Sequence, residues 1–204
     1  GPNQLDLAIT YEKGQFSLLA IDEYSTSRPV YYKQHLYSSM RTGNYRQPLP
    51  TVITNDYIIT HNVYLDHDLI VLGNVIIQPG VKFEIDPCRL ISVSGSLSIN
   101  GEAENRVSFS GTCHKSTPAY WSCIDLRNHS RSSFHQVTVQ NAKHGLLIND
   151  YGQHHISLSK FTNNDHGLTV YNSSPYLYRN EFSGNITAGL SLYHLATPHF
   201  GDMS

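Results

Sequence analysis

The chain has 204 residues, enough for one domain with a sizeable core or for a domain with a short appendage. Its formal net charge is −2, and basic residues are neither clustered nor interleaved with aromatic ones, which argues against a nucleic-acid partner. No apolar run approaches the roughly 18 to 20 residues of a membrane-spanning helix. Gly1-Pro2 is typical of a protease-cleavage scar, so we expect a piece of a longer protein whose other parts would supply any membrane anchor.

Residues 1–53 are predicted to form a β-hairpin and an irregular segment that precede the main domain at 54–204. Apolar and polar residues alternate over 5–22 around a three-residue turn that ends in Gly14. A two-stranded hairpin is only marginally stable alone, so this one is expected to pack on another part of the protein. Residues 23–53 are rich in Ser, Tyr and Pro without a sustained period, which is typical of a wrapping or linking segment.

From Tyr57 onward, strand-like segments recur every 22 residues. The alternating apolar residues of 69–77 return at 91–99, and those of 81–85 return after a longer turn at 107–109. Alternation at every second residue is the period of a β-strand, and a fixed period of about 20 to 50 residues indicates stacked repeats. We therefore predict that each repeat forms one coil of a parallel β-helix, with about three short strands.

The stretch from Phe134 to Leu192 repeats with the same period, and roughly six coils fit before His199. Three columns align: Asn141, Asn163 and Asn185; Gly145, Gly167 and Gly189; Leu146, Leu168 and Leu190. We expect the glycines to supply turns with positive φ before each strand. Coils stack about 4.8 Å apart, so the asparagines are expected to form an internal hydrogen-bonded ladder.

The three cysteines allow one disulfide and leave one thiol unpaired. Cys113 and Cys123 flank a segment that interrupts the coil rhythm, and a disulfide between them would staple this insertion. Cys88 lies one coil earlier, so a Cys88–Cys113 bridge is the competing possibility.

Three N-glycosylation sequons begin at Asn128, Asn172 and Asn185. Three such motifs in a chain of this size favour the secretory route and an extracellular location. A ladder residue points inward, so Asn128 and Asn172 are the expected glycan acceptors.

Asp125 and Arg127 are two residues apart in a predicted strand and would face the same side, with Asp150 on a later coil. A surface ion pair is the commoner explanation of such a pair, and the carboxylates are too few for a glycosidase. His144 and His166 share a column without the further ligands of a structural metal site. Neither a metal ion nor a cofactor is therefore expected.

The order of these segments, among them 73–85, 91–101 and the Asn/Gly repeats, resembles right-handed parallel β-helix domains of the pectate-lyase-like superfamily. It is similar in particular to non-enzymatic modules of Bark beetle (Anakonda)-type proteins of tricellular junctions. The resemblance covers about residues 57–195.

This resemblance implies an all-β fold and an extracellular structural or adhesion module that binds another protein or a second copy of itself, with a glycan as a further candidate partner. The alternative that it implies is a β-helix enzyme, a lyase or hydrolase of acidic glycans, in which Asp125, Arg127 and Asp150 would be the catalytic candidates.

Overall fold

The computed structural model describes residues 6–12, 15–21, 49–112, 119–127, 129–149 and 151–201. The chain divides into two units, with the boundary between Asn44 and Tyr45. In the first unit, β1 (Asp6–Glu12) and β2 (Gln15–Ile21) pair in antiparallel fashion, which confirms the predicted hairpin. Glu12 pairs with Gln15, so two residues separate the strands where three were predicted.

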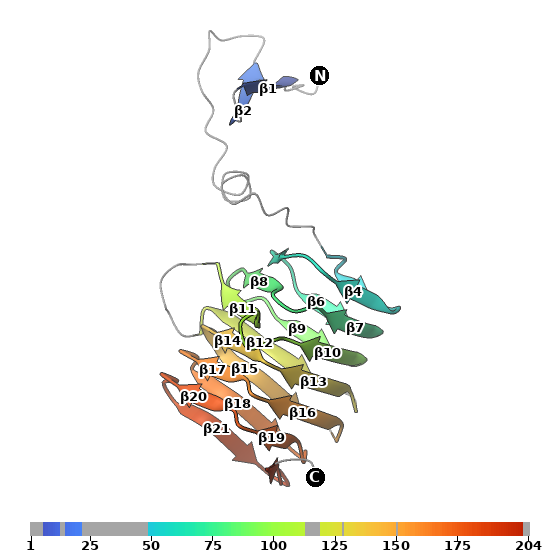
Figure 1. Cartoon of the computed structure of the whole chain (residues 1–204), viewed down its shortest axis with the longest axis vertical. Helices are drawn as coiled ribbons and strands as arrows, with labels where there is room; N and C mark the ends of the chain where they lie inside the picture. Colours follow the sequence, from blue (N-terminus) through green and yellow to red (C-terminus); the bar gives the residue numbers. More distant parts are fainter. Residues whose placement is uncertain are drawn as a thin grey trace. The chain divides into compact units, whose positions relative to one another are not determined.

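The second unit is a parallel β-helix built from three sheets, in which the strands of each sheet come from successive coils (Figure 1). Sheet 1 contains β3 (Val52–Ile53), β6 (Leu69–Val71), β9 (Ile91–Val93), β12 (Trp121–Leu126), β15 (Ala142–Asn149), β18 (His166–Tyr171) and β21 (Ala188–Tyr193). Sheet 2 contains β4 (Tyr57–Ile59), β7 (Asn74–Ile77), β10 (Ser96–Asn100), β13 (Arg131–His135), β16 (Gln153–Ser157), β19 (Tyr176–Tyr178) and β22 (His199–Phe200). Sheet 3 contains β5 (Val63–Leu65), β8 (Lys82–Ile85), β11 (Val107–Gly111), β14 (Val137–Gln140), β17 (Lys160–Thr162) and β20 (Glu181–Ser183).

The coil period predicted from the sequence is confirmed by the strand register. Leu69 pairs with Ile91 in sheet 1, and the column Leu146, Leu168 and Leu190 is in register. The stack starts earlier than Tyr57, however, because β3 already pairs with β6. A two-residue strand is too short for alternation to be recognised in the sequence. No helix in the described ranges is long and apolar enough to cross a membrane.

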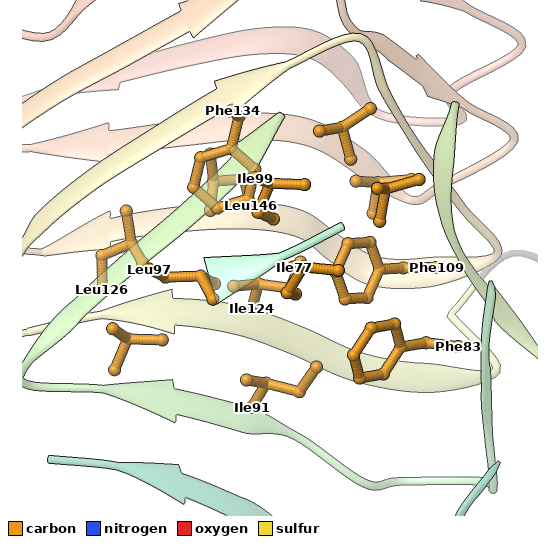
Figure 2. Close-up of a cluster of buried hydrophobic side chains, with 14 of the residues drawn as sticks. Ile77, Phe83, Ile91, Leu97, Ile99, Phe109, Ile124, Leu126, Phe134 and Leu146 are labelled. Carbon is orange, nitrogen blue, oxygen red and sulfur yellow. The ribbon is translucent and has the colours of Figure 1, made fainter. Parts of the chain in front are cut away.

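The core runs along the axis of the β-helix between the three sheets. Alternate side chains of each strand point inward. Inward residues at equivalent positions of successive coils therefore form apolar columns that line the interior. Phe83 and Phe109 are stacked in successive coils of sheet 3, with ring centroids 4.5 Å apart (Figure 2). Both rings are fully buried. Because the strands of successive coils pair in register, similar side chains stack on one another in the core.

The glycine column has a different cause from the one predicted. Positive φ is found at Gly80, Gly184 and Gly201 but not at Gly145 or Gly167. A Cβ on Gly145 would lie 2.5 Å from the carbonyl oxygen of Gly167, on the next coil. The column is therefore glycine because neighbouring coils approach too closely for any side chain.

The predicted ladder of Asn141, Asn163 and Asn185 is correct at Asn185, but Asn164 takes the place predicted for Asn163, and Asn141 is a turn residue. Asn163 is exposed, and its φ of 55° matches the left-handed φ of Asn141 (65°) and Gly184 (64°). Strands β17 and β20 are offset by 21 residues instead of 22. This shorter coil aligns Asn185 with Asn164, so Asn163 is a turn residue.

Asn164 and Asn185 form the internal ladder. Asn164 Oδ1 accepts a hydrogen bond from the N–H of Ala142 (2.9 Å), and Asn164 Nδ2 donates to the carbonyl of Val139 (3.1 Å). Asn185 Oδ1 accepts from the N–H of Asn164 (3.0 Å), and Asn185 Nδ2 donates to the carbonyl of Phe161 (2.9 Å). Each side chain thus satisfies a turn N–H of the preceding coil.

A second ladder, not predicted from the sequence, connects the coils at the turn between sheets 2 and 3. Ser159 Oγ accepts from the N–H of Val137 (3.1 Å), and Asn180 Oδ1 accepts from the N–H of Ser159 (3.0 Å). Asn180 Nδ2 donates to the carbonyl of Ile156 (2.8 Å). The change from Ser to Asn hides this column from a search for identical residues.

Candidate functional site

The outer face of sheet 1 carries the candidate residues that the sequence suggested. Register places Asp125, Leu147, Thr169 and Ser191 in one outward column. The next column holds Cys123, His144, His166 and Ala188. The sheet therefore brings a carboxylate, a thiol and two imidazoles onto one face.

Asp125 and Arg127 form an ion pair on this face, as their two-residue spacing predicted. Arg127 Nε donates to Asp125 Oδ2 at 2.6 Å, and Arg127 Nη2 contacts the same oxygen. This hydrogen bond and the negative charge of Asp125 raise the pKa of Arg127. Asp125 is only 2% exposed, and its Oδ1 is buried without a hydrogen-bond partner in the described residues. The carboxylate of Asp125 is thus buried. Asp150, the third catalytic candidate, lies outside the described residues.

The two histidines form a stack. Their rings lie 4.8 Å apart at an angle of 14°. His144 Nδ1 is 3.1 Å from Thr169 Oγ1, and His166 Nδ1 is 3.2 Å from Ser191 Oγ, each on the following coil. Burial, followed by the neighbouring His166, lowers the pKa of His144. Among the described residues no group of three or more His, Cys, Asp or Glu side chains is placed to hold a metal ion.

The described cysteines are not linked. Cys123 is a buried free thiol and Cys88 an exposed one, whereas Cys113 lies outside the described residues. The predicted Cys113–Cys123 disulfide is therefore not found. Burial raises the pKa of Cys123 to about 11. Because the thiolate is the nucleophilic form, Cys123 is poorly suited to attack a substrate at neutral pH.

Aromatic stacks run along the outer faces towards the C-terminal coil. His155, Tyr176 and His199 stack in sheet 2, with centroids 5.0 Å and 4.8 Å apart. Tyr171 and Tyr193 stack in sheet 1 at 4.7 Å. These columns were not identified in the sequence, where only the spacing of about 22 residues between similar rings could have indicated them.

A hollow lies on the outer face of sheet 2. Its lining residues include Ser98, Ser133, Arg131, Gln153 and His155. Its described lining residues include no acidic side chain, and their hydrogen-bonding groups are hydroxyl, amide, imidazole and guanidinium.

The N-terminal end of the β-helix has a closed core. Ile59, Val63 and Leu65, the inward residues of the first coil, are fully buried. Leu49 and Ile53 belong to the same core. Among the described residues near this end, the exposed apolar side chains lie on the outside of the sheets, as Ile76 (39%) does.

The C-terminal end has an open core. Leu192 continues the column of Ile148 and Val170, which are fully buried, yet it is 44% exposed. Phe200 pairs with the buried Leu177 and is 69% exposed. Further apolar side chains on the last coil, Ile186, Tyr193 and Leu195, are also exposed. Because β20, β21 and β22 are the last strands of their sheets, each has one edge without a partner strand among the described residues.

The sequons occupy different environments. Asn185 Nδ2, the atom to which an N-linked glycan would be attached, donates inward to Phe161, whereas Asn172 lies in a partly exposed turn with φ of 50°. Asn128 lies outside the described residues. No protein-family model matches this chain, and comparisons with curated proteins and with solved structures find no significant match.

Proposed function

We propose that this protein is an extracellular structural or adhesion module, part of a larger secreted or membrane-anchored protein, and that it contacts another protein through the C-terminal end of its β-helix. The exposure of Leu192 and Phe200 at the end of buried core columns carries the proposal. Burying apolar surface is favourable by about 25 cal/mol per Å², and exposed apolar patches with polar surroundings mark interaction sites.

The extracellular part of the proposal is supported by the three sequons and by the resemblance to pectate-lyase-like and tricellular-junction β-helix modules. The inward hydrogen bond of Asn185 supports Asn128 and Asn172 as the acceptors. Intact-mass analysis of secreted protein is expected to show loss of a glycan in Asn128→Gln or Asn172→Gln. The mass of Asn185→Gln is expected to change only by the substitution itself. Loss of a glycan in this variant would contradict the assignment of Asn128 and Asn172 as acceptors.

The outer faces favour a structural role over catalysis. Their histidines stack and bind hydroxyl groups of the next coil, and Asp125 is bound by Arg127. We therefore expect no turnover of polygalacturonate or hyaluronan. Turnover that disappears in Asp125→Asn would replace the proposal with the enzyme alternative.

Sedimentation velocity tests the contact through the C-terminal end. Without its partner, an exposed apolar end is expected to associate weakly with the same end of a second copy, so the sedimentation coefficient should rise with protein concentration. Leu192→Lys should abolish this rise because it places a charge on the exposed core. Ile76→Lys is the matched control, since Ile76 is similarly exposed but lies on the outside of sheet 2.

A rise that persists in Leu192→Lys, or that is lost in Ile76→Lys alone, would place the contact elsewhere. A strictly monomeric wild-type protein would contradict association through this end.

A further inference from the structure

We infer that the stack of His144 and His166 is a pH-sensitive latch on the outer face of sheet 1. The latch is closed while at most one of the two imidazoles is protonated, and it opens when both are. The inference is independent of the contact proposed for the C-terminal end, because it concerns side chains on the outside of the coils.

In the closed form the two rings lie against hydroxyl groups of the following coils. His144 Nδ1, on β15, is 3.1 Å from Thr169 Oγ1 on β18, and His166 Nδ1 is 3.2 Å from Ser191 Oγ on β21. Thr169 and Ser191 share an outward column, yet they are only 1% and 9% exposed. The imidazoles that contact these hydroxyl groups therefore contribute to covering them.

The two rings are too close to each other for both to be charged without repulsion. Their centroids are 4.8 Å apart and their planes are inclined by 14°. The strand register fixes this spacing, because His144 pairs directly with His166. A like charge within about 4 to 6 Å disfavours the charged form of a titratable group, and burial does so as well. A first proton meets no like charge across the stack, whereas a second proton meets an imidazolium.

Among the described residues, the strands beside the stack bring no unpaired charge that would compensate a second proton. Burial raises the pKa of Cys123, in the same column of β12, to about 11, so this thiol is neutral where histidines titrate. Asp125 on the same strand is bound by Arg127. The other titratable residues of β18 and β21 are Tyr171 and Tyr193, which stack on each other.

The charges next to the two histidines in the chain are one lysine and one aspartate. Lys143 precedes His144, and Asp165, which precedes His166, accepts a hydrogen bond from Thr187 Oγ1. Burial lowers the pKa of His144 most, followed by the neighbouring His166 and then Lys143. The carboxylates nearby act in the opposite direction but have the smaller effect. The surroundings therefore favour an uncharged His144 in the closed stack.

A latch of this kind gives the outer face of sheet 1 two forms. At neutral pH the face presents stacked rings over the hydroxyl groups of Thr169 and Ser191. In acid it would present two separated imidazolium groups and uncovered hydroxyl groups. Protonation of histidines between pH 5 and 8 is a common origin of such switches. A partner that covers this face would therefore bind in only one of the two pH ranges.

His135 shows the same kind of hydroxyl contact without a second imidazole. Its Nδ1 is 2.8 Å from Ser157 Oγ on the following coil of sheet 2. No other ring stacks on it in the part of the chain that the structure describes. His135 thus serves as a control for what protonation does to a histidine that contacts a hydroxyl group alone.

An NMR titration of the imidazole rings in the full chain tests the coupling. His166→Phe keeps a ring in the column but removes the group that can be charged. We expect His144 to titrate at a higher pH in this variant than in the wild type. His135→Phe is the matched control, since it removes a histidine from sheet 2, and it should leave the titration of His144 unchanged.

Nuclear Overhauser effects between the ring protons measure the opening. In the wild type, those between His144 and His166 should be present at pH 8 and lost on acidification to pH 5, while the backbone signals of β15 remain those of the folded protein. In His166→Phe, the effects between His144 and the new ring should persist at pH 5, because only one charge can form.

Two results would overturn the inference. One is an unchanged titration of His144 in His166→Phe, which would show that the two rings do not influence each other's charge. The other is a wild-type stack whose ring contacts survive after both histidines have been protonated. The wild-type titration needs no substitution, so it still decides whether the stack opens if His166→Phe does not fold.

Discussion

The two ends of the β-helix are built from the same columns but differ in how much core they expose. At the N-terminal end Val63 and Leu65 are fully buried, whereas at the C-terminal end Leu192 and Phe200 remain largely exposed. An inward side chain at either end of a stacked fold lacks a neighbouring coil on one side. The difference shows that sequence pattern alone does not make a core residue; what lies over the side chain in space does.

This comparison also separates stability from interaction. Inward residues of the middle coils, such as Phe109, are covered on both sides and are expected to stabilise the fold. Equivalent residues of the last coil contribute less to folding because water already reaches them. They retain apolar surface that a partner can bury.

The largest predicted effect comes from removing a central core ring. Phe109→Ala should lower the free energy of unfolding by about 3 to 5 kcal/mol, because it leaves a cavity next to Phe83. Phe200→Ala, the matched change at the open end, should cost less than about 1 kcal/mol, because most of that ring is already in water. Urea denaturation of both variants measures the difference. Equal losses would mean that the C-terminal end is covered in solution.

The glycine column gives a second comparison between the middle and the end. In Gly167→Ala the new Cβ would lie 2.4 Å from the carbonyl oxygen of Gly189, so neighbouring coils must separate. We expect a loss of about 1 to 3 kcal/mol. In Gly189→Ala the nearest atom is the Cβ of Phe182 at 2.8 Å, with no carbonyl of a following coil within reach, so the loss should be smaller. A melting temperature that falls equally in both variants would contradict this explanation.

The ladder residue and the turn residue beside it should respond differently to substitution. Asn164→Ala removes an acceptor for the buried N–H of Ala142, at a cost of about 1 to 3 kcal/mol. Asn163→Gly should be nearly neutral, because glycine adopts the positive φ of this exposed turn without strain. Thermal denaturation of the two variants decides which asparagine is internal. A larger loss in Asn163→Gly would support Asn163 as the internal residue instead.

The smallest predicted effect is a pH dependence of stability that comes from His144. Its pKa is lowered in the folded protein, so the folded state binds fewer protons than the unfolded state does. The contribution to stability is complete above the unfolded pKa of about 6.5 and declines as the pH falls below it. Denaturation midpoints at pH 8 and pH 5 should differ less in His144→Gln than in the wild type. An unchanged difference would assign the pH dependence to other groups.

The sequence by itself determined the coil architecture. Inward residues such as Leu69 and Ile91 alternate with outward ones, and alternation is a local property that can be read along the chain. The 22-residue spacing then predicts that such segments stack. The same local rule placed Asp125 and Arg127 on one side of one strand, which the ion pair confirms.

Features that depend on the length of each turn, or on the neighbouring coils, were decided only by the tertiary structure. A coil of 21 residues moves the ladder from Asn163 to Asn164, a change that a fixed 22-residue alignment cannot detect. Gly145 is required by the carbonyl of the next coil and not by its own φ, so its role is not local either. The burial of Asp125 and the exposure of Leu192 likewise follow from what lies over each side chain, because accessible surface is a property of neighbours in space and not of neighbours along the chain.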